Sequence, residues 1–337
     1  MGEREDAPLS DAEANARLAP LLAERAETGL LLAVSGGPDS VALMRLAAPL
    51  ARDAGARLSV ATVDHGLREG SAAEAETVAR WARDAGLPHR TLAWTGEKPH
   101  AGLQDAARAA RYALLAVHAR EIGAGALATA HHRDDQAETV LMRLAAGSGI
   151  AGLAGMRARA DLDGLVLARP FLDLPKARLV ATCRARGWPH VEDPSNAAAR
   201  FARARLRGIA PLLAAEGLDA ARLARLAGRA ARADDALEAA TEAAFARIRI
   251  GEAPLLLDAG LLRAEPEEIA LRVLARALRE AGGGVGYDRL LRLEALWARL
   301  APALDANAPF RATLAGALVD AAGGRIRVAP EPPRRHR

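Results

Sequence analysis

Leu30-Leu31-Leu32-Ala33-Val34-Ser35-Gly36-Gly37-Pro38-Asp39-Ser40 is the stretch that decides the fold, and Val41 to Met44 continue it with apolar residues. Its apolar start predicts a strand buried on both faces, as in the middle of a parallel sheet. The Ser-Gly-Gly turn ends the strand, and Pro-Asp-Ser opens a helix, because proline suits a first helical turn. The free N–H groups at that helix N-terminus predict a phosphate-binding site.

The spacing excludes a Walker-type loop, whose lysine reaches the terminal phosphates, because no lysine lies near this stretch. Ser-Gly-Gly-x-Asp-Ser instead resembles the PP-loop of the N-type ATP pyrophosphatases, which cleave ATP between its α and β phosphates. On that resemblance the glycine amides and the hydroxyls of Ser35 and Ser40 hold pyrophosphate, and Asp39 helps to place Mg²⁺. An ordinary glycine-rich turn with a capping Ser or Asp is the alternative.

Composition bounds the class of protein. The 337 residues are enough for two domains, and we find no run of eighteen apolar residues and no signal peptide, so no membrane association is expected. Cys183 is the only cysteine, which excludes an internal disulfide and Cys-x-x-Cys chemistry and fits a cytoplasmic location. The formal charge is +4 with arginine far in excess of lysine, which permits a nucleic-acid partner without demonstrating one.

Alternating patterns of strand and helix follow the first strand along the chain. We expect a doubly wound parallel sheet, because buried strands alternate with helices of ten or more residues. Ser71 and Glu74 have the spacing of a capping box. The expected helices are 9–26, 38–54, 71–86, 103–122 and one that follows the stretch 131–139 and runs to about 146, and the expected strands are 30–34, 57–63, 89–94 and 126–130.

Polar clusters follow the strands of this predicted sheet. Ser35 to Ser40 follow the first strand, Asp64-His65 the second, and His131 to Glu138 the fourth. Because ligands of such sheets bind at the carboxyl ends of the strands, we expect one site there. Adjacent histidines point apart and disfavour zinc, so the acidic residues are expected to face Mg²⁺ or a cationic substrate, or simply to cap the helix and complement its dipole.

Further motifs, in the same order, resemble the tRNA(Ile)-lysidine synthetase family. The likeness runs from about residue 30 to residue 209. Its motifs are Val63-Asp64-His65-Gly66-Leu67-Arg68, Arg108-Ala109-Ala110-Arg111-Tyr112, Ala130-His131-His132-Arg133-Asp134-Asp135-Gln136-Ala137-Glu138-Thr139, Gly147-Ser148-Gly149-Ile150-Ala151-Gly152-Leu153, Arg169-Pro170-Phe171-Leu172 and Asp193-Pro194-Ser195-Asn196.

The resemblance implies an ATP-dependent ligase that joins free L-lysine to C2 of the wobble cytidine in the isoleucine tRNA with a CAU anticodon. The reaction runs through an adenylated tRNA, releases AMP and pyrophosphate, and changes codon reading from AUG to AUA. The implied cofactors are ATP and Mg²⁺.

The same resemblance implies roles for individual residues. The catalytic set is Asp39, His131, His132, Asp135 and Arg111, with either histidine as the proton acceptor. ATP would contact Ala33, Ser35, Gly36, Gly37, Pro38, Asp39 and Ser40. Lysine or the metal would face Asp134, Asp135 and Glu138, and Arg108 with Arg111 would neutralise phosphate charge or line a solvated helix face.

A basic, largely helical stretch follows the last of these motifs. Arg200, Arg203, Arg205 and Arg207 open it, and we interpret them as tRNA contacts, with a solvated face as the alternative. The expected domains are a PP-loop catalytic domain (1–212), a mainly helical tRNA-binding domain ending in a short hairpin (213–329), and a basic, disordered tail (330–337). Further helices are expected over about 219–249, 266–281 and 287–300.

Three other functions compete with this interpretation. A 2-thiocytidine-type tRNA-modifying enzyme shares the loop but depends on paired cysteines, which this chain lacks. An amidating relative acting on a small carboxylate would not need the arginine-rich stretch. A non-catalytic tRNA-binding protein would not keep Ser35, Asp39 and Asp135. The sequence leaves the oligomeric state open, a homodimer included.

Overall fold

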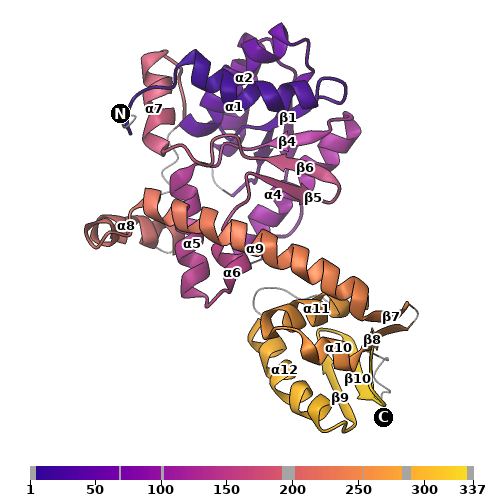
Figure 1. Cartoon of the computed structure of the whole chain (residues 1–337). Coiled ribbons are helices and arrows are strands. Elements are labelled where there is room, and N and C mark those ends of the chain that lie inside the picture. The colour runs from indigo at the N-terminus through magenta and orange to yellow at the C-terminus, as the bar shows by residue number, and fades with distance from the viewer. Residues whose placement is uncertain are drawn as a thin grey trace. The chain divides into compact units, whose positions relative to one another are not determined.

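The computed structural model describes residues 5–67, 70–99, 102–191, 202–252, 254–282 and 290–331 of the chain (Figure 1). It forms two compact units: Met1–Leu141 with Met156–Ala224, and Met142–Gly155 with Arg225–Arg337. Each unit has its own buried apolar core, and the first has one on either side of its sheet. Asp193 to Asn196, Arg200 and the end of the chain from residue 332 lie outside the described residues.

The first unit is built on a six-stranded sheet in the order β3-β2-β1-β4-β6-β5. All neighbouring strands run parallel except β5 and β6, which confirms the doubly wound prediction. Leu30, Leu31 and Leu32 of the central strand are buried, as expected for a strand covered on both faces. The strands are β1 Leu30–Ala33, β2 Leu58–Asp64, β3 His89–Ala93, β4 Ala126–Ala128, β5 Arg159–Leu162 and β6 Leu165–Ala168.

The β5–β6 hairpin was not predicted from the sequence. Its turn is Asp163-Gly164, with φ of 51° and 82°, which is the Asp-Gly signature of a two-residue hairpin. The flanking strands are only four residues long, so their alternation is too brief to reveal them. The hairpin extends the sheet beside β4 and so supports the loop that follows β4.

The described residues between Asp11 and Ala215 form eight helices, most of which belong to this first unit. The expected capping box at Ser71 is wrong, because Gly70, with φ of 91°, precedes the helix and Ser71 is its first residue. Ser71 instead hydrogen-bonds the Asp64 carboxylate at the end of β2. The helices are α1 Asp11–Glu24, α2 Pro38–Asp53, α3 Ser71–Asp84, α4 Leu103–Glu121, α5 Arg133–Ala145, α6 Ile150–Leu153, α7 Lys176–Ala185 and α8 Ala202–Ala215; α6 groups with the second unit.

The second unit combines helices with a five-stranded antiparallel sheet, in the order β7-β8-β11-β10-β9. The expected hairpin is present as β10–β11, turning at Gly323-Gly324, but the other three strands were not anticipated. The elements are α9 Ala220–Ile248, which begins in the first unit, β7 Arg249–Glu252, β8 Leu255–Asp258, α10 Ala259–Ala264, α11 Glu267–Glu280, α12 Leu290–Asp305, β9 Phe310–Leu314, β10 Ala317–Ala322 and β11 Arg325–Pro330.

Crossing a bilayer requires a long and strongly apolar helix. None of the described helices is both long enough and apolar enough to do so.

Candidate active site

The site lies where the strand order of the sheet reverses direction. From β1 the chain proceeds outward to β2 and β3. β4 pairs with the other side of β1 and is followed in the sheet by β6 and β5 (Figure 1). Because β1 and β4 are parallel neighbours, the loops that follow them meet at one edge of the sheet. In open α/β sheets this switch point is where ligands bind.

The loop after β1 exposes the N-terminus of α2. Gly37 is the N-cap, with no side chain to occupy the first-turn N–H groups, and Pro38 follows it. Ser40 is 6% exposed; its hydroxyl donates to the Gly37 carbonyl over 3.0 Å and accepts from the Ser35 backbone N–H over 3.2 Å. These contacts shape a ring of donors suited to an anion, as predicted from the sequence.

The backbone of Gly36 strongly favours glycine in this loop. Its φ is +91°, and a Cβ added there would lie 3.1 Å from a methyl carbon of Val78. The Gly36 carbonyl accepts the Val191 N–H over 2.9 Å. The Cys183 thiol donates to the Pro38 carbonyl over 3.3 Å, and burial, with the charge of Asp39, raises the pKa of that thiol to about 11, so it stays protonated. These two hydrogen bonds, with Val191 and with Cys183, therefore fix the backbone of the loop.

His132 connects the loop after β1 with the loop after β4. Its imidazole is 4% exposed, and its Nε2 lies 3.5 Å from Oδ2 of Asp39 and 3.3 Å from Oδ2 of Asp135. The Asp135 backbone nitrogen lies 3.3 Å from Nδ1. Nε2 therefore lies between two carboxylates, one from the first turn of α2 and one from the first turn of α5.

These neighbours set the protonation of His132. Burial opposes a charged imidazole, but the hydrogen bond with Asp39 and the charges of Asp135, Asp39 and Asp134 outweigh burial and raise the pKa of His132. His132 therefore keeps its proton to a higher pH than an ordinary histidine does.

His131 has the opposite environment. Burial, followed by the positive charges of Arg111, Arg169, Arg108 and Arg203, holds the pKa of His131 well below its usual value. Its Nδ1 lies 2.8 Å from the Thr129 hydroxyl. His131 is therefore neutral at physiological pH and a weak base, which distinguishes the two adjacent histidines that the sequence left equivalent.

Asp39 provides a test of whether the site fits a divalent cation. Its Oδ1 is buried and has no hydrogen-bond partner among the residues that the structure describes. Within those residues, no group of three or more His, Cys, Asp or Glu side chains is arranged to hold a metal. Mg²⁺ suits this environment, because it is usually bound by one or two carboxylates together with substrate phosphates and water.

The other two acidic residues have protein partners. Asp134 Oδ2 accepts the backbone N–H of Lys176 over 2.8 Å and so joins α5 to the start of α7. Glu138 is 7% exposed and accepts from the Arg207 guanidinium at 2.5 Å, with a nitrogen of Arg203 3.5 Å away. Burial opposes the charge of Arg207, but the hydrogen bond that Arg207 donates to Glu138 outweighs burial and raises the pKa of Arg207.

The structure therefore gives Arg203 and Arg207 a position that the sequence did not suggest. Both were expected at a tRNA surface, and both reach the acidic residues of α5; Arg203 also lies 3.9 Å from Asp135 Oδ1. The only indication in the sequence was their i, i+4 spacing, which places both side chains on one face of a helix. Arg205 is exposed on α8, and Arg200 lies outside the described residues.

The remaining site residues predicted from the sequence lie near the same edge of the sheet, where the strands β1 and β4 end. Ala33 is the only residue of β1 that is not buried, so a small side chain borders the open end of that strand. Arg111 lies with its guanidinium carbon 5.3 Å from the centre of the Tyr112 ring, and its charge reaches both His131 and His65. Arg108 stacks on the same ring at 5.1 Å. Within the described residues, the fold brings the loop, the histidines and the acidic cluster together.

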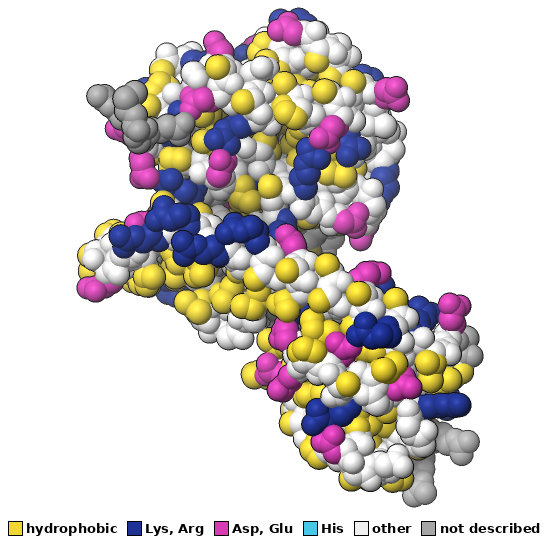
Figure 2. Space-filling model, in the orientation of Figure 1, with side chains coloured by type: hydrophobic (Ala, Val, Ile, Leu, Met, Phe, Trp, Pro, Cys, Tyr) yellow, Lys and Arg dark blue, Asp and Glu magenta, His cyan; other side chains and the backbone are white. Residues whose placement is uncertain are grey.

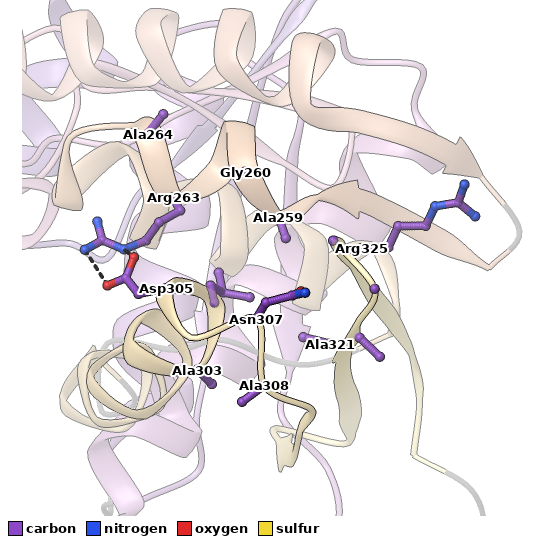
Figure 3. Close-up of a pocket in the computed structure, with 14 residues that line it drawn as sticks. Ala259, Gly260, Arg263, Ala264, Ala303, Asp305, Asn307, Ala308, Ala321 and Arg325 are labelled. Atoms are coloured by element: carbon purple, nitrogen blue, oxygen red, sulfur yellow. Dashed lines mark hydrogen bonds and ion pairs between the residues drawn. The ribbon is translucent and has the colours of Figure 1, made fainter.

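Two further features, a cavity and a group of arginines, lie outside the candidate active site. A cavity of about 590 Å³ in the second unit is lined mainly by small residues and by the exposed Arg263–Asp305 ion pair (Figure 3). In the space-filling view, dark-blue arginines gather along the first half of α9 (Figure 2). The α9 residues with the spacing of one helix face are Arg222, Arg225, Arg229 and Arg232.

Comparison with known proteins agrees with this fold. Residues 10–213 match a family of ATP-binding domains described as the PP-loop domain, which is the class that the loop after β1 and the parallel sheet define. Among solved structures, a U34-tRNA thiolase from Methanococcus maripaludis is similar over 65% of this chain and 77% of its own, with a TM-score of 0.55 and 15% identity, which shows a shared fold.

Curated relatives match almost the whole chain. A tRNA(Ile)-lysidine synthase from Methylobacterium sp. (strain 4-46) is 60% identical over 334 residues, covering 97% of this chain and 96% of that protein. One from Bradyrhizobium diazoefficiens is 48% identical over 359 residues, covering 100% of this chain and 98% of that protein. The chain belongs to the tRNA(Ile)-lysidine synthase family.

Proposed function

We propose that this protein joins free L-lysine to C2 of the wobble cytidine in the isoleucine tRNA whose anticodon is CAU, using ATP. The observation that carries the proposal is the meeting of a phosphate-binding loop after β1 with the acidic residues after β4 around His132. Relatives of nearly identical length that are named for this activity support it. The product would read AUA instead of AUG.

The first step activates the cytidine. Its C2 oxygen attacks the α-phosphorus of ATP, the bond to the bridging oxygen breaks, and pyrophosphate leaves. The first-turn N–H groups of α2 and the hydroxyls of Ser35 and Ser40 would hold the departing pyrophosphate, and Ala33 would border the adenine. Mg²⁺ bound beside Asp39 would supply positive charge to the phosphates.

The second step forms the carbon–nitrogen bond. The ε-amine of lysine attacks C2, and AMP leaves with the former C2 oxygen. Because the amine must be unprotonated to attack, and the nitrogen sheds a further proton afterwards, a base is needed nearby. His132, with Asp135, is the group that we assign to this proton transfer, because its raised pKa suits it and the lowered pKa of His131 does not.

The charged residues shared by α5 and α8 suit a ligand that carries charges of both signs. Asp135 and Glu138 present carboxylates, and Arg203 and Arg207 present guanidinium groups within 4 Å of them. Free lysine has two amines and one carboxylate, so it would exchange ion pairs with this set. Asp134, tied to the Lys176 backbone, would contribute its charge at the edge of the pocket.

The tRNA body would contact the arginines of α9, and Arg205 on α8 is a further, separate candidate for such a contact. A domain boundary near residue 212, a tRNA-binding role for the second unit, a homodimer and a cytoplasmic location remain predictions. Sedimentation of the purified protein, alone and with tRNA, would measure the subunit number.

The experiment that tests the function is transfer of labelled lysine to a CAU-anticodon isoleucine tRNA transcript with ATP and Mg²⁺. We expect label in that transcript and none in an elongator methionine tRNA, with AMP and pyrophosphate formed in proportion. AMP formation with label in neither transcript would contradict the proposal, and sulfur incorporation instead would favour the 2-thiocytidine-type alternative. tRNA binding without AMP formation would favour a non-catalytic binder.

A further inference from the structure

A group of aromatic and basic side chains lies beside the site, at the ends of β2 and β3. His65 follows β2 and Trp94 follows β3, and their rings meet edge to face with centres 5.9 Å apart. The Lys98 ammonium lies 5.6 Å from the centre of the Trp94 ring and donates to the Gly66 carbonyl over 3.2 Å. None of these residues belongs to the loop, the histidine pair or the acidic cluster described above.

The backbone holds this group rigidly. The Trp94 N–H donates to the Asp64 carbonyl over 2.8 Å, and the Asp64 carboxylate accepts the Gly66 N–H over 2.8 Å. Hydrogen bonds from Ser71 and Gly66 lower the pKa of Asp64, so that carboxylate stays charged and keeps the turn closed. Trp94 is nonetheless only half-buried, so part of its ring surface is available to a ligand.

The charge around these rings is mainly positive, and the Asp64 carboxylate is the acid that faces both His65 and Lys98. Within the described residues, Lys98, Arg108 and Arg111 form no ion pair with an acid, and both arginines stack on Tyr112. Burial, and next the charge of Arg111, lower the pKa of His65, which is therefore a neutral ring at physiological pH. His65 Nδ1 is buried and has no hydrogen-bond partner among those residues. Flat rings beside unpaired cations suit a stacked base with its phosphates.

We propose that His65, Trp94, Lys98 and Arg111 form a subsite for an unpaired nucleotide of the RNA loop, next to the nucleotide that reacts. A base stacks on the open surface of Trp94, and Lys98 and Arg111 bind the phosphates on either side of it. The inference rests on the proposed function and adds a specific part of the RNA contact to it.

The position of the group separates it from the ATP site. Neighbouring strands lie about 4.8 Å apart, so β3, two strands from β1, is about 10 Å from the phosphate-binding loop. An RNA loop whose reacting base enters beside His132 extends over such a distance to adjacent nucleotides. Single-stranded bases are commonly recognised by this combination of stacking and cations.

The first test compares steady-state constants of variants. Trp94→Ala should raise the KM for tRNA about tenfold, because stacking on an aromatic contributes about 1–3 kcal/mol per base. Trp94→Phe should retain most of the affinity, Lys98→Gln should weaken it, and Lys98→Arg should restore it. The KM values for ATP and lysine should not change. Arg90→Ala, at the other end of β3, is the matched control and should behave as the unaltered protein does.

The second test needs no variant, so it holds even if Trp94→Ala fails to fold. The chain has two lysines, Lys98 and Lys176. Amine acetylation followed by mass spectrometry should show Lys98 protected at least severalfold by a CAU-anticodon transcript, with Lys176 as internal reference. An isolated anticodon stem-loop should protect Lys98, and ATP alone should not.

The outcomes separate this inference from the proposed function. If lysine is transferred to tRNA normally while Trp94→Ala keeps its KM for tRNA and Lys98 stays reactive, the subsite is wrong and the function stands. If ATP alone protects Lys98, or Trp94→Ala raises the KM for ATP, the group belongs to the nucleotide pocket and the inference is wrong. Absence of lysine transfer by the unaltered protein would instead overturn the function.

Discussion

Charged residues concentrate in two regions of this protein, and the two regions use charge differently. Around His132, three carboxylates approach one imidazole, and an oxygen of Asp39 is buried with no partner among the described residues. Between α9 and α11, arginines are paired with acids instead: Arg272 lies 2.9 Å from Asp234 and 2.7 Å from Glu268.

A second arginine extends the pattern in the C-terminal unit. Arg276 lies 2.8 Å from Glu242, and its guanidinium carbon lies 4.5 Å from the centre of the Phe245 ring. Charges that neutralise each other contribute to helix packing and leave little for a ligand. Like charges held together without compensation cost stability, and a cationic ligand or a metal relieves that cost. The comparison therefore separates a region built for binding from one built for stability.

The largest expected effect is on activity, at Asp39. Asp39→Asn should lower kcat about 10²–10³-fold, because the carboxylate that would face Mg²⁺ and the pyrophosphate is gone. Melting temperature should stay the same or rise slightly, because repulsion with Asp135 is removed. Lysine-transfer kinetics and thermal unfolding of the same preparation measure both. A large fall in stability with kcat retained would reverse the assignment of this region to binding.

Gly36 tests the geometry of the loop. Gly36→Ala should raise the KM for ATP about tenfold or more, since φ of +91° disfavours alanine by about 1–2 kcal/mol and the new Cβ meets Val78. Gly55→Ala is the matched control: its φ is +63°, yet nothing lies within 4 Å of the added Cβ. Both variants should lose stability, and only the first should lose ATP affinity. Equal ATP constants would mean that the loop tolerates a side chain.

The pH dependence of lysine transfer tests the proton-transfer role of His132. The neutral imidazole is the base, and its raised pKa should place the acidic limb of kcat/KM above the pH expected for an ordinary imidazole. Asp134→Asn removes a negative charge that favours the protonated form, so the limb should move to lower pH. The asparagine oxygen still accepts the Lys176 N–H. Glu76→Gln, exposed on α3, should leave the profile unchanged; a shift to higher pH at Asp134 would refute the assignment.

The smallest effect is expected in the C-terminal unit. Arg272→Ala should lower stability by about 1 kcal/mol, because it leaves Asp234 and Glu268 without a shared cation. Arg279→Ala, exposed on the same helix, should have no measurable effect on unfolding. Saturating lysine-transfer rates should be unaffected in both, and a fall in kcat for Arg272→Ala would show that this ion-pair region also takes part in the reaction.

Much of the first unit could be predicted from the sequence. The strand Leu30–Ala33, the glycine loop and the helix from Pro38 are local features, since apolar runs and glycine or proline positions act within a few residues. The parallel order also followed, because strands alternate with helices. The β5–β6 hairpin and most of the C-terminal sheet were missed, because their strands are four to six residues long and too short for a clear alternation.

The candidate site could be predicted only in part. Its location followed from polar residues at strand ends, but the different protonation of the adjacent His131 and His132 depends on neighbours from other elements. The same holds for Trp94, whose contact with His65 requires β2 and β3 to be paired. Nothing in the local sequence around Trp94 distinguishes it from a core residue.

The sequence by itself determined the phosphate-binding loop, the parallel architecture and the set of residue types available for chemistry, because glycine conformation, helix capping and hydrophobic periodicity are properties of short segments. Only the tertiary structure decided which of those residues meet. Glu138 contacts Arg203 and Arg207, which follow it by 65 and 69 positions, and His132 lies between carboxylates from the first turns of α2 and α5. Such pairs depend on strand order and helix packing, and their electrostatic energies depend on burial, which exists only once the chain has folded.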